Sequence, residues 1–125
     1  MLALTSGDVV INFGGQIAVR GKREVAIAHP RYRNRPVVTI TLRDASLSTS
    51  SDSEHPGHII DPATGQSVPA RGSVSVIDSS AFRADALSTA LYVMGPARGR
   101  IWAIAHNIVA IFITDSGEVT WSRKP

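Results

Sequence analysis

Short runs of β-branched and other apolar residues recur along this chain and constrain its fold more than any other feature. The runs predict strands at 9–13, 16–20, 24–28, 37–42, 73–77 and 108–114, with a last strand at 118–121. Several are joined by short turns such as Asn34-Arg35-Pro36 and Asp115-Ser116-Gly117, which favours antiparallel pairing. The serine-rich stretch 46–58 is expected to be a loop.

A strong helical signal interrupts the predicted strands. Any of Asp78, Ser79 and Ser80 can cap a helix that runs to about Met94, where Gly95-Pro96 would end it. A second, shorter helix is predicted over 97–105. These elements predict an α+β fold, with an antiparallel sheet and helices packed on one side of it.

The overall composition sets broad limits on the function. At 125 residues the chain has the length of a single domain with a core of its own. It has no cysteine, which excludes disulfides and thiolate metal sites. No apolar run approaches the length of a transmembrane helix, and the opening residues lack the charged start of a signal peptide.

Two basic clusters contribute to the formal net charge of +3. The clusters are Arg20, Lys22 and Arg23, then Arg31, Arg33 and Arg35. We expect both to lie in exposed turns between strands, although such clusters can also attract phosphates. A nucleic-acid-binding module is a lesser alternative, because the clusters lack the series of aromatic residues that single-stranded nucleic-acid binders use for stacking.

Two compact blocks contain most of the residues with chemical potential. The first, 58–65, contains His58, Asp61 and Thr64 and reads as a tight loop, because Pro62 fixes its own backbone and Gly65 permits a positive φ. In the second block, 84–90, Asp85 and Thr89 stand four apart on the predicted helix. They therefore present a carboxylate and a hydroxyl to one point, a pair that suits a hard, oxygen-seeking cation.

Each of these two helix residues also has a purely structural interpretation. Asp85 could be a solvated charge or a partner of Arg83, and Thr89 could bond back to a carbonyl of its own helix.

The two blocks, in this order and at this separation, resemble the ApbE family, the FAD:protein FMN transferases. Three other stretches match in sequence order: the strand that ends in Gly14-Gly15, the strand that ends in His29-Pro30, and the segment around Thr49. The resemblance covers nearly the whole chain and implies a T-fold-like architecture. Family members have a long additional N-terminal region, so we expect 1–125 to be one domain, incomplete, and the C-terminal part of such an enzyme. A missing N-terminal half or a partner chain would supply the rest.

The resemblance also implies an activity and a set of roles. The family transfers FMN from FAD to a threonine or serine hydroxyl of a flavin-accepting target protein, with Mg²⁺ as cofactor, and releases AMP. By this resemblance Asp85 and Thr89 would hold the Mg²⁺, and His58 would be catalytic, close to the transferred phosphate. The residues expected to bind FAD are Gly14, Gly15, Thr49, His58, Asp61 and Thr64.

Some of these roles have alternatives. Asp61 is expected to brace its loop rather than act as an acid, and Thr64 could touch phosphate or simply stabilise the turn. His29, His55 and His106 are expected to be surface or strand histidines with no task. Ser51 replaces the glycine of the family's threonine-serine-glycine segment, which can alter how the flavin is presented. A non-catalytic remnant that binds flavin or a partner is the alternative function. Family members are commonly exported to the cell envelope, but nothing in this sequence specifies a location.

Overall fold

A single antiparallel sheet organises the molecule. The computed structural model describes residues 2–5, 8–13, 15–32, 34–51, 62–66 and 71–123. Within them the strands are β1 (Leu2–Thr5), β2 (Asp8–Phe13), β3 (Gln16–Ala28), β4 (Pro36–Ser51), β5 (Ser73–Asp78), β6 (Val109–Ile113) and β7 (Val119–Trp121). Each strand pairs with its neighbours in the sequence, so the order across the sheet is the order along the chain.

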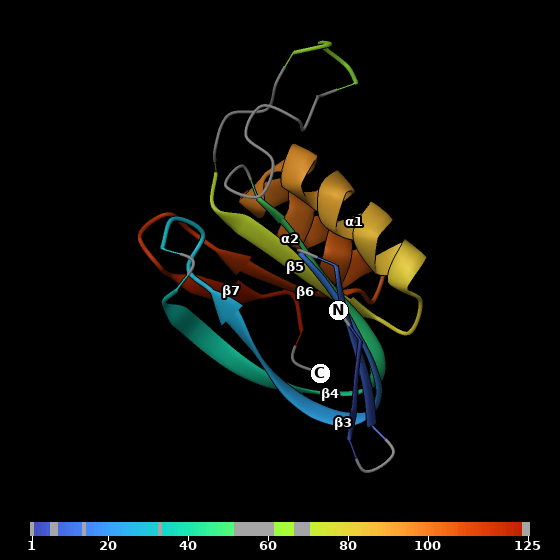
Figure 1. Ribbon diagram of the computed structural model, residues 1–125. Coiled ribbons are helices and arrows are strands. Elements are labelled where there is room, and N and C mark those ends of the chain that lie inside the picture. Colours follow the sequence, from blue (N-terminus) through green and yellow to red (C-terminus); the bar gives the residue numbers. More distant parts are fainter. Residues whose placement is uncertain are drawn as a thin grey trace.

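Two helices lie between β5 and β6 in the sequence and cover one face of the sheet (Figure 1). They are α1 (Ala81–Met94) and α2 (Pro96–Ala105). Neither is long and apolar enough to cross a membrane, and the same holds for every helix in the described part of the chain. The predicted α+β class, with helices on one side of an antiparallel sheet, is confirmed.

The predicted break between 16–20 and 24–28 is wrong, because both belong to the single long strand β3. Gly21, with φ of +91°, introduces a bulge instead of a turn. Its backbone N–H donates to Asp44 Oδ1 of β4 at 2.8 Å, which ties the bulge to the neighbouring strand. The first basic cluster is exposed as expected, but it lies within this strand rather than in a turn.

The predicted loop 46–58 is wrong over residues 46–51, which extend β4 and pair with β5 as far as Ser51 opposite Ser73. The serines of this stretch are buried. Ser50 Oγ lies 2.8 Å from Ser88 Oγ, and Thr49 Oγ1 lies 2.7 Å from Ser75 Oγ, so these hydroxyls bond to other elements and not to a turn of their own backbone. Residues 52–58 of that prediction lie outside the described residues. The strand β1 was not predicted at all.

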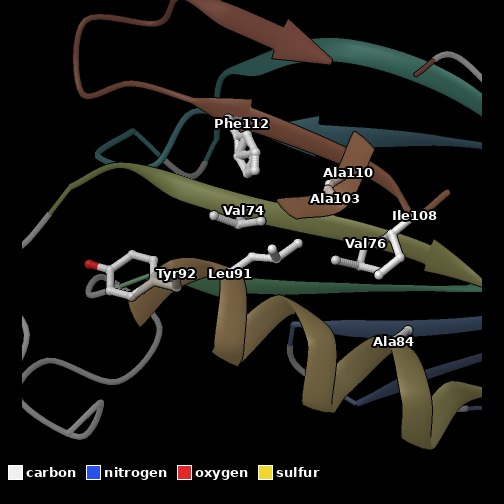
Figure 2. Close-up of a cluster of buried hydrophobic side chains, with 9 residues drawn as sticks. All are labelled: Val74, Val76, Ala84, Leu91, Tyr92, Ala103, Ile108, Ala110 and Phe112. Atoms are coloured by element: carbon white, nitrogen blue, oxygen red, sulfur yellow. The ribbon is translucent and has the colours of Figure 1, made fainter. Parts of the chain in front are cut away.

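Apolar side chains are buried on both faces of the sheet. On the helix face, Leu91 and Tyr92 of α1 and Ala103 of α2 pack against β5 and β6 (Figure 2). On the other face, Ile111 and Ile113 of β6 form one cluster with residues of β3 and β4, namely Val19, Val25, Ile27, Ile40, Leu42 and Leu47. Since β3 and β6 are not neighbours in the sheet, the sheet must curl to bring them together, as the bent β3 and β4 in Figure 1 show.

His29 lies where the curled sheet meets itself. It is only 5% exposed, and a Cβ added to Gly117, in the turn between β6 and β7, would lie 3.4 Å from its ring. Its Nδ1 accepts the backbone N–H of Arg31 at 3.0 Å, so the other ring nitrogen carries the proton of the neutral ring. Of the expectation of a surface or strand histidine, the surface part is therefore wrong for His29, because its ring is part of the packing that closes the curl.

Candidate functional site

Three side chains fix the N-terminus of α1, one turn before the candidate metal ligands. Ser80 Oγ accepts the backbone N–H of Arg83 at 3.1 Å, and Asp78 Oδ2 accepts that of Ser80 at 2.9 Å. Arg83 Nε lies 3.2 Å from Asp78 Oδ1 in an exposed ion pair. Arg83 is thus engaged by Asp78, which leaves the Asp85 carboxylate exposed one turn into the helix.

Asp85 and Thr89 lie on the edge of α1 that meets β4. Thr89 Oγ1 donates to the main-chain oxygen of Asp85 at 3.1 Å, the back-bond expected of a helix threonine. Ser48 Oγ of β4 lies 3.4 Å from Asp85 Oδ1, and Ser50 Oγ lies 3.3 Å from Thr89 Oγ1. The structure therefore brings both predicted ligands together with hydroxyls of the neighbouring strand.

This oxygen-rich donor set fits a hard cation. The back-bond uses the one proton of the Thr89 hydroxyl and leaves its lone pairs free to accept or to coordinate. Among the described residues no group of three His, Cys, Asp or Glu side chains could hold a metal. Mg²⁺ commonly binds through one or two carboxylates and keeps several water molecules, so Asp85 and Thr89 suit it as two ligands of a larger set.

The end of the glycine pair lies next to this cluster. Gly15 O accepts the backbone N–H of Thr49 at 2.7 Å, and Gln16, which pairs with Ser48, donates through Nε2 to Ala81 O at 2.6 Å. The start of β3 is thereby tied both to β4 and to the N-terminus of α1. Gly14 lies outside the described residues.

The Thr49 hydroxyl lies apart from the Asp85 cluster. Neighbouring residues of a strand point to opposite faces, so Thr49 faces away from the side to which Ser48 and Ser50 point. Its Oγ1 is 2.7 Å from Ser75 Oγ on β5. Only the backbone of Thr49 is therefore adjacent to Gly15 and to the group formed by Asp85, Thr89, Ser48 and Ser50.

The predicted catalytic histidine lies in the sequence between β4 and β5, whose adjoining ends are paired at Ser51 and Ser73. His58 and Asp61 lie outside the described residues. Thr64 is exposed and its Oγ1 accepts the backbone N–H of Gln66 at 3.2 Å, which agrees with a role in stabilising the turn. Near the return to β5, Arg71 Nη1 donates to Val93 O at 3.1 Å at the end of α1.

Sequence reasoning missed the buried hydroxyls of Ser48, Ser50 and Ser88. Ser50 Oγ and Ser88 Oγ are 2.8 Å apart across the contact between β4 and α1. A signal was present, because serines at 46, 48 and 50 repeat with the period of a strand, but a serine-rich stretch is also typical of loops. The other described histidine, His106, is exposed and stacks on Trp102 with ring centroids 4.0 Å apart.

These observations define an α+β protein with a curled antiparallel sheet and an oxygen-rich cluster where its first helix meets β4. The model of the ApbE family matches residues 3–113, and the chain belongs to that family.

The individual relatives agree with this family. The chain is 36% identical to the FAD:protein FMN transferase of Vibrio cholerae serotype O1 over 88% of its own length and 38% of that protein. Among solved structures, it resembles the apo form of the Pseudomonas stutzeri flavinyl transferase ApbE with a TM-score of 0.75 and 30% identity, over 91% of this chain and 41% of that one. It resembles the ApbE protein of Thermotoga maritima with a TM-score of 0.78 and 26% identity, over 94% and 42% of the two chains. The chain thus spans roughly two fifths of the length of these relatives.

Proposed function

We propose that this chain is the C-terminal, metal-binding part of an FAD:protein FMN transferase. The proposed reaction transfers the FMN moiety of FAD to a threonine or serine hydroxyl of a target protein. The observation that carries the proposal is the pair Asp85 and Thr89, held on one edge of α1 beside the hydroxyls of β4. Relatives of this chain named as FAD:protein FMN transferases support the choice of reaction.

The chemistry assigns a task to each part of the site. The acceptor hydroxyl oxygen forms a bond to the phosphorus on the FMN side of the pyrophosphate, while the bond from that phosphorus to the bridging oxygen breaks and AMP leaves with that oxygen. Mg²⁺, when bound, supplies positive charge to the pyrophosphate. Asp85 and Thr89 hold that charge in place, and His58 takes the proton of the acceptor hydroxyl. Gly15, whose carbonyl accepts the backbone N–H of Thr49, is assigned to the backbone that approaches the flavin nucleotide.

Metal binding by the chain itself tests the first half of this proposal. Mn²⁺ replaces Mg²⁺ at many oxygen sites and can be followed by electron paramagnetic resonance. Asp85→Asn keeps the size of the side chain but removes its charge, so the dissociation constant for Mn²⁺ should rise about tenfold or more. Asp78→Asn is the matched control, because Asp78 belongs to the same helix start but is paired with Arg83. Equal Mn²⁺ affinity in the chain and in Asp85→Asn would exclude the assigned metal site.

Transfer itself is tested in a chimaera in which residues 3–113 replace the matching segment of the Vibrio cholerae transferase. We expect Mg²⁺-dependent, covalent attachment of flavin to an acceptor protein, detected by in-gel fluorescence, and its loss in Asp85→Ala. A chimaera that retains FAD but transfers no FMN would support the alternative of a non-catalytic, flavin-binding remnant.

A further inference from the structure

A chain of hydroxyls connects the buried interior to the Asp85 carboxylate. It begins at Ser50 and Ser88, whose Oγ atoms are 2.8 Å apart, continues from Ser88 to Ser48 Oγ at 3.3 Å, and ends at Asp85 Oδ1, 3.4 Å from Ser48. The three serines come from β4 and α1, which are far apart in the sequence. Sequence proximity therefore does not explain the arrangement.

Burial makes the hydroxyl of Ser88 informative. Ser88 is 0% exposed and lies one helical turn from Ala84 on the buried side of α1, where an alanine would pack without a polar group to satisfy. A buried hydroxyl is costly unless it is hydrogen-bonded. Ser88 has an additional acceptor in the main-chain oxygen of Asp85 at 3.1 Å, so its proton is satisfied within this network.

Counting protons gives the network a direction. A serine hydroxyl has one proton to donate, and an ionised carboxylate can only accept. The proton of Ser48 must therefore point to Asp85 when the two are bonded. One arrangement that fits these distances has Ser50 donating to Ser88 instead of to Thr89 Oγ1, and Ser88 donating toward Ser48 or the Asp85 carbonyl. All donors in this arrangement point toward Asp85, whose carboxylate is the final acceptor at 3.4 Å from Ser48 Oγ.

We propose that Ser48 is a positioning residue for the metal ligand Asp85 and that Ser50 and Ser88 orient the Ser48 hydroxyl. An exposed aspartate samples several χ1 rotamers unless a contact selects one. The bond from Ser48 selects the rotamer whose second oxygen stays available to a cation together with Thr89. Outer partners of this kind fix ligand orientation in metal sites generally. This inference rests on the proposed function only for the identification of Mg²⁺ as the ion that Asp85 binds.

The rotamer of Asp85 in the metal-free 125-residue chain is the primary test. Three-bond couplings measured by nuclear magnetic resonance report whether χ1 is fixed or averaged. We expect a single dominant rotamer in the chain, averaging in Ser48→Ala, and a fixed rotamer in the control Ser75→Ala. Ser75 is an equally buried strand serine, but it bonds to Thr49 on the opposite face. Ser48→Cys, with a similar volume and a weak donor, should behave as Ser48→Ala and serves if the alanine variant fails to fold.

Mn²⁺ affinity is the second measurement. Ser48→Ala should raise the dissociation constant about tenfold, the lower end of the range for loss of an outer partner. Ser88→Ala should raise it less, about threefold, because Ser88 acts through Ser48. Ser50→Ala combined with Ser88→Ala should add little to Ser88→Ala alone, since the two residues share one chain of bonds.

The two measurements separate this inference from the proposed function. Averaged Asp85 couplings in the unaltered chain, or couplings unchanged by Ser48→Ala and Ser48→Cys, would overturn the positioning role. A fixed rotamer that depends on Ser48, in a chain whose Mn²⁺ binding is insensitive to Asp85→Asn, would instead overturn the metal site while the positioning of Asp85 by Ser48 stands.

Discussion

Gly72, the residue before β5, lies in close contact with the backbone of β6. Its φ is +87°, and a Cβ at this position would collide with the carbonyl oxygen of Ile113 on β6. The positive φ and the lack of space for a Cβ atom therefore both require glycine at this position. Ser73, the next residue, pairs with Ser51 of β4 on one side and with Ile113 of β6 on the other.

Gly72→Ala should consequently destabilise the chain strongly. The left-handed backbone and the collision together should cost about 3 kcal/mol or more of the free energy of unfolding. Gly65→Ala is the matched control, because Gly65 also has a positive φ, of +72°, but an added Cβ has no atom within 4 Å. Its cost should stay at about 1 kcal/mol. Urea unfolding followed by circular dichroism measures both, and similar losses would contradict the steric argument.

His58 is the residue to which we assign the proton of the acceptor hydroxyl. In the chimaera, His58→Ala should lower the single-turnover rate of FMN transfer by on the order of a hundredfold, with a smaller change in FAD affinity. His106→Ala is the appropriate control, since His106 is exposed and stacks only on its neighbour Trp102. His29→Ala is unsuitable, because His29 is buried and its loss would disturb the fold. Equal rates for His58→Ala and His106→Ala would leave the chemistry to the metal and the acceptor hydroxyl.

At the scale of elements, the start of α1 determines where Asp85 stands. Ser80 is the N-cap, and its Oγ accepts the backbone N–H of Arg83. Ser80→Ala should reduce the free energy of unfolding by about 1 kcal/mol, as is usual for a lost cap. Ser79→Ala, at the exposed neighbouring position, should change it by less than about 0.5 kcal/mol. Thermal unfolding of the two variants gives the comparison, and the capping role fails if Ser79→Ala is the more harmful.

The sequence predicted the helices well because their signals are local. The cap before Ala81 and the glycine and proline after Met94 lie within one stretch of chain, and α1 is found over the residues between them. The strands β5 and β7 were also close to their predicted bounds. Local signals are sufficient for an element whose two ends are determined by residues within it or directly beside it.

The candidate site was only partly predictable, because its partners are distant in the sequence. The spacing of Asp85 and Thr89 shows that they share a helix face, but Ser48 and Ser50 join them from the other side of the segment 52–70. A serine-rich stretch favours a loop unless other hydroxyls satisfy it, and those hydroxyls come from α1 and β5. In the same way, Gly21 reads as a turn until Asp44 is known to lie opposite it.

At the scale of the whole molecule, the chain presents apolar side chains to solvent. On the helix layer, Phe82 is 85% exposed and Ile101 is 68% exposed. Because of these side chains, we expect the isolated chain to self-associate. We also expect only weak FAD binding and little or no FMN transfer, because the chain spans roughly two fifths of the length of its relatives. Sedimentation velocity tests the self-association, a fluorescence titration tests the FAD binding, and a flavin-transfer assay tests the transfer. The double variant Phe82→Ser with Ile101→Ser should reduce the association, and efficient transfer by the chain alone would show that no further part is needed.

The order of the strands also has a consequence for folding during synthesis on the ribosome. Because every strand lies beside its predecessor, each new strand can pair as soon as it emerges, with its partner already made. The apolar cluster inside the curl is different, because it combines residues of β3 and β4 with Ile111 and Ile113 of β6, which are synthesised later. Until Ile111 and Ile113 are synthesised, the apolar face of a nascent β3 and β4 lacks part of its cover, so closure of the curl must follow the synthesis of β6.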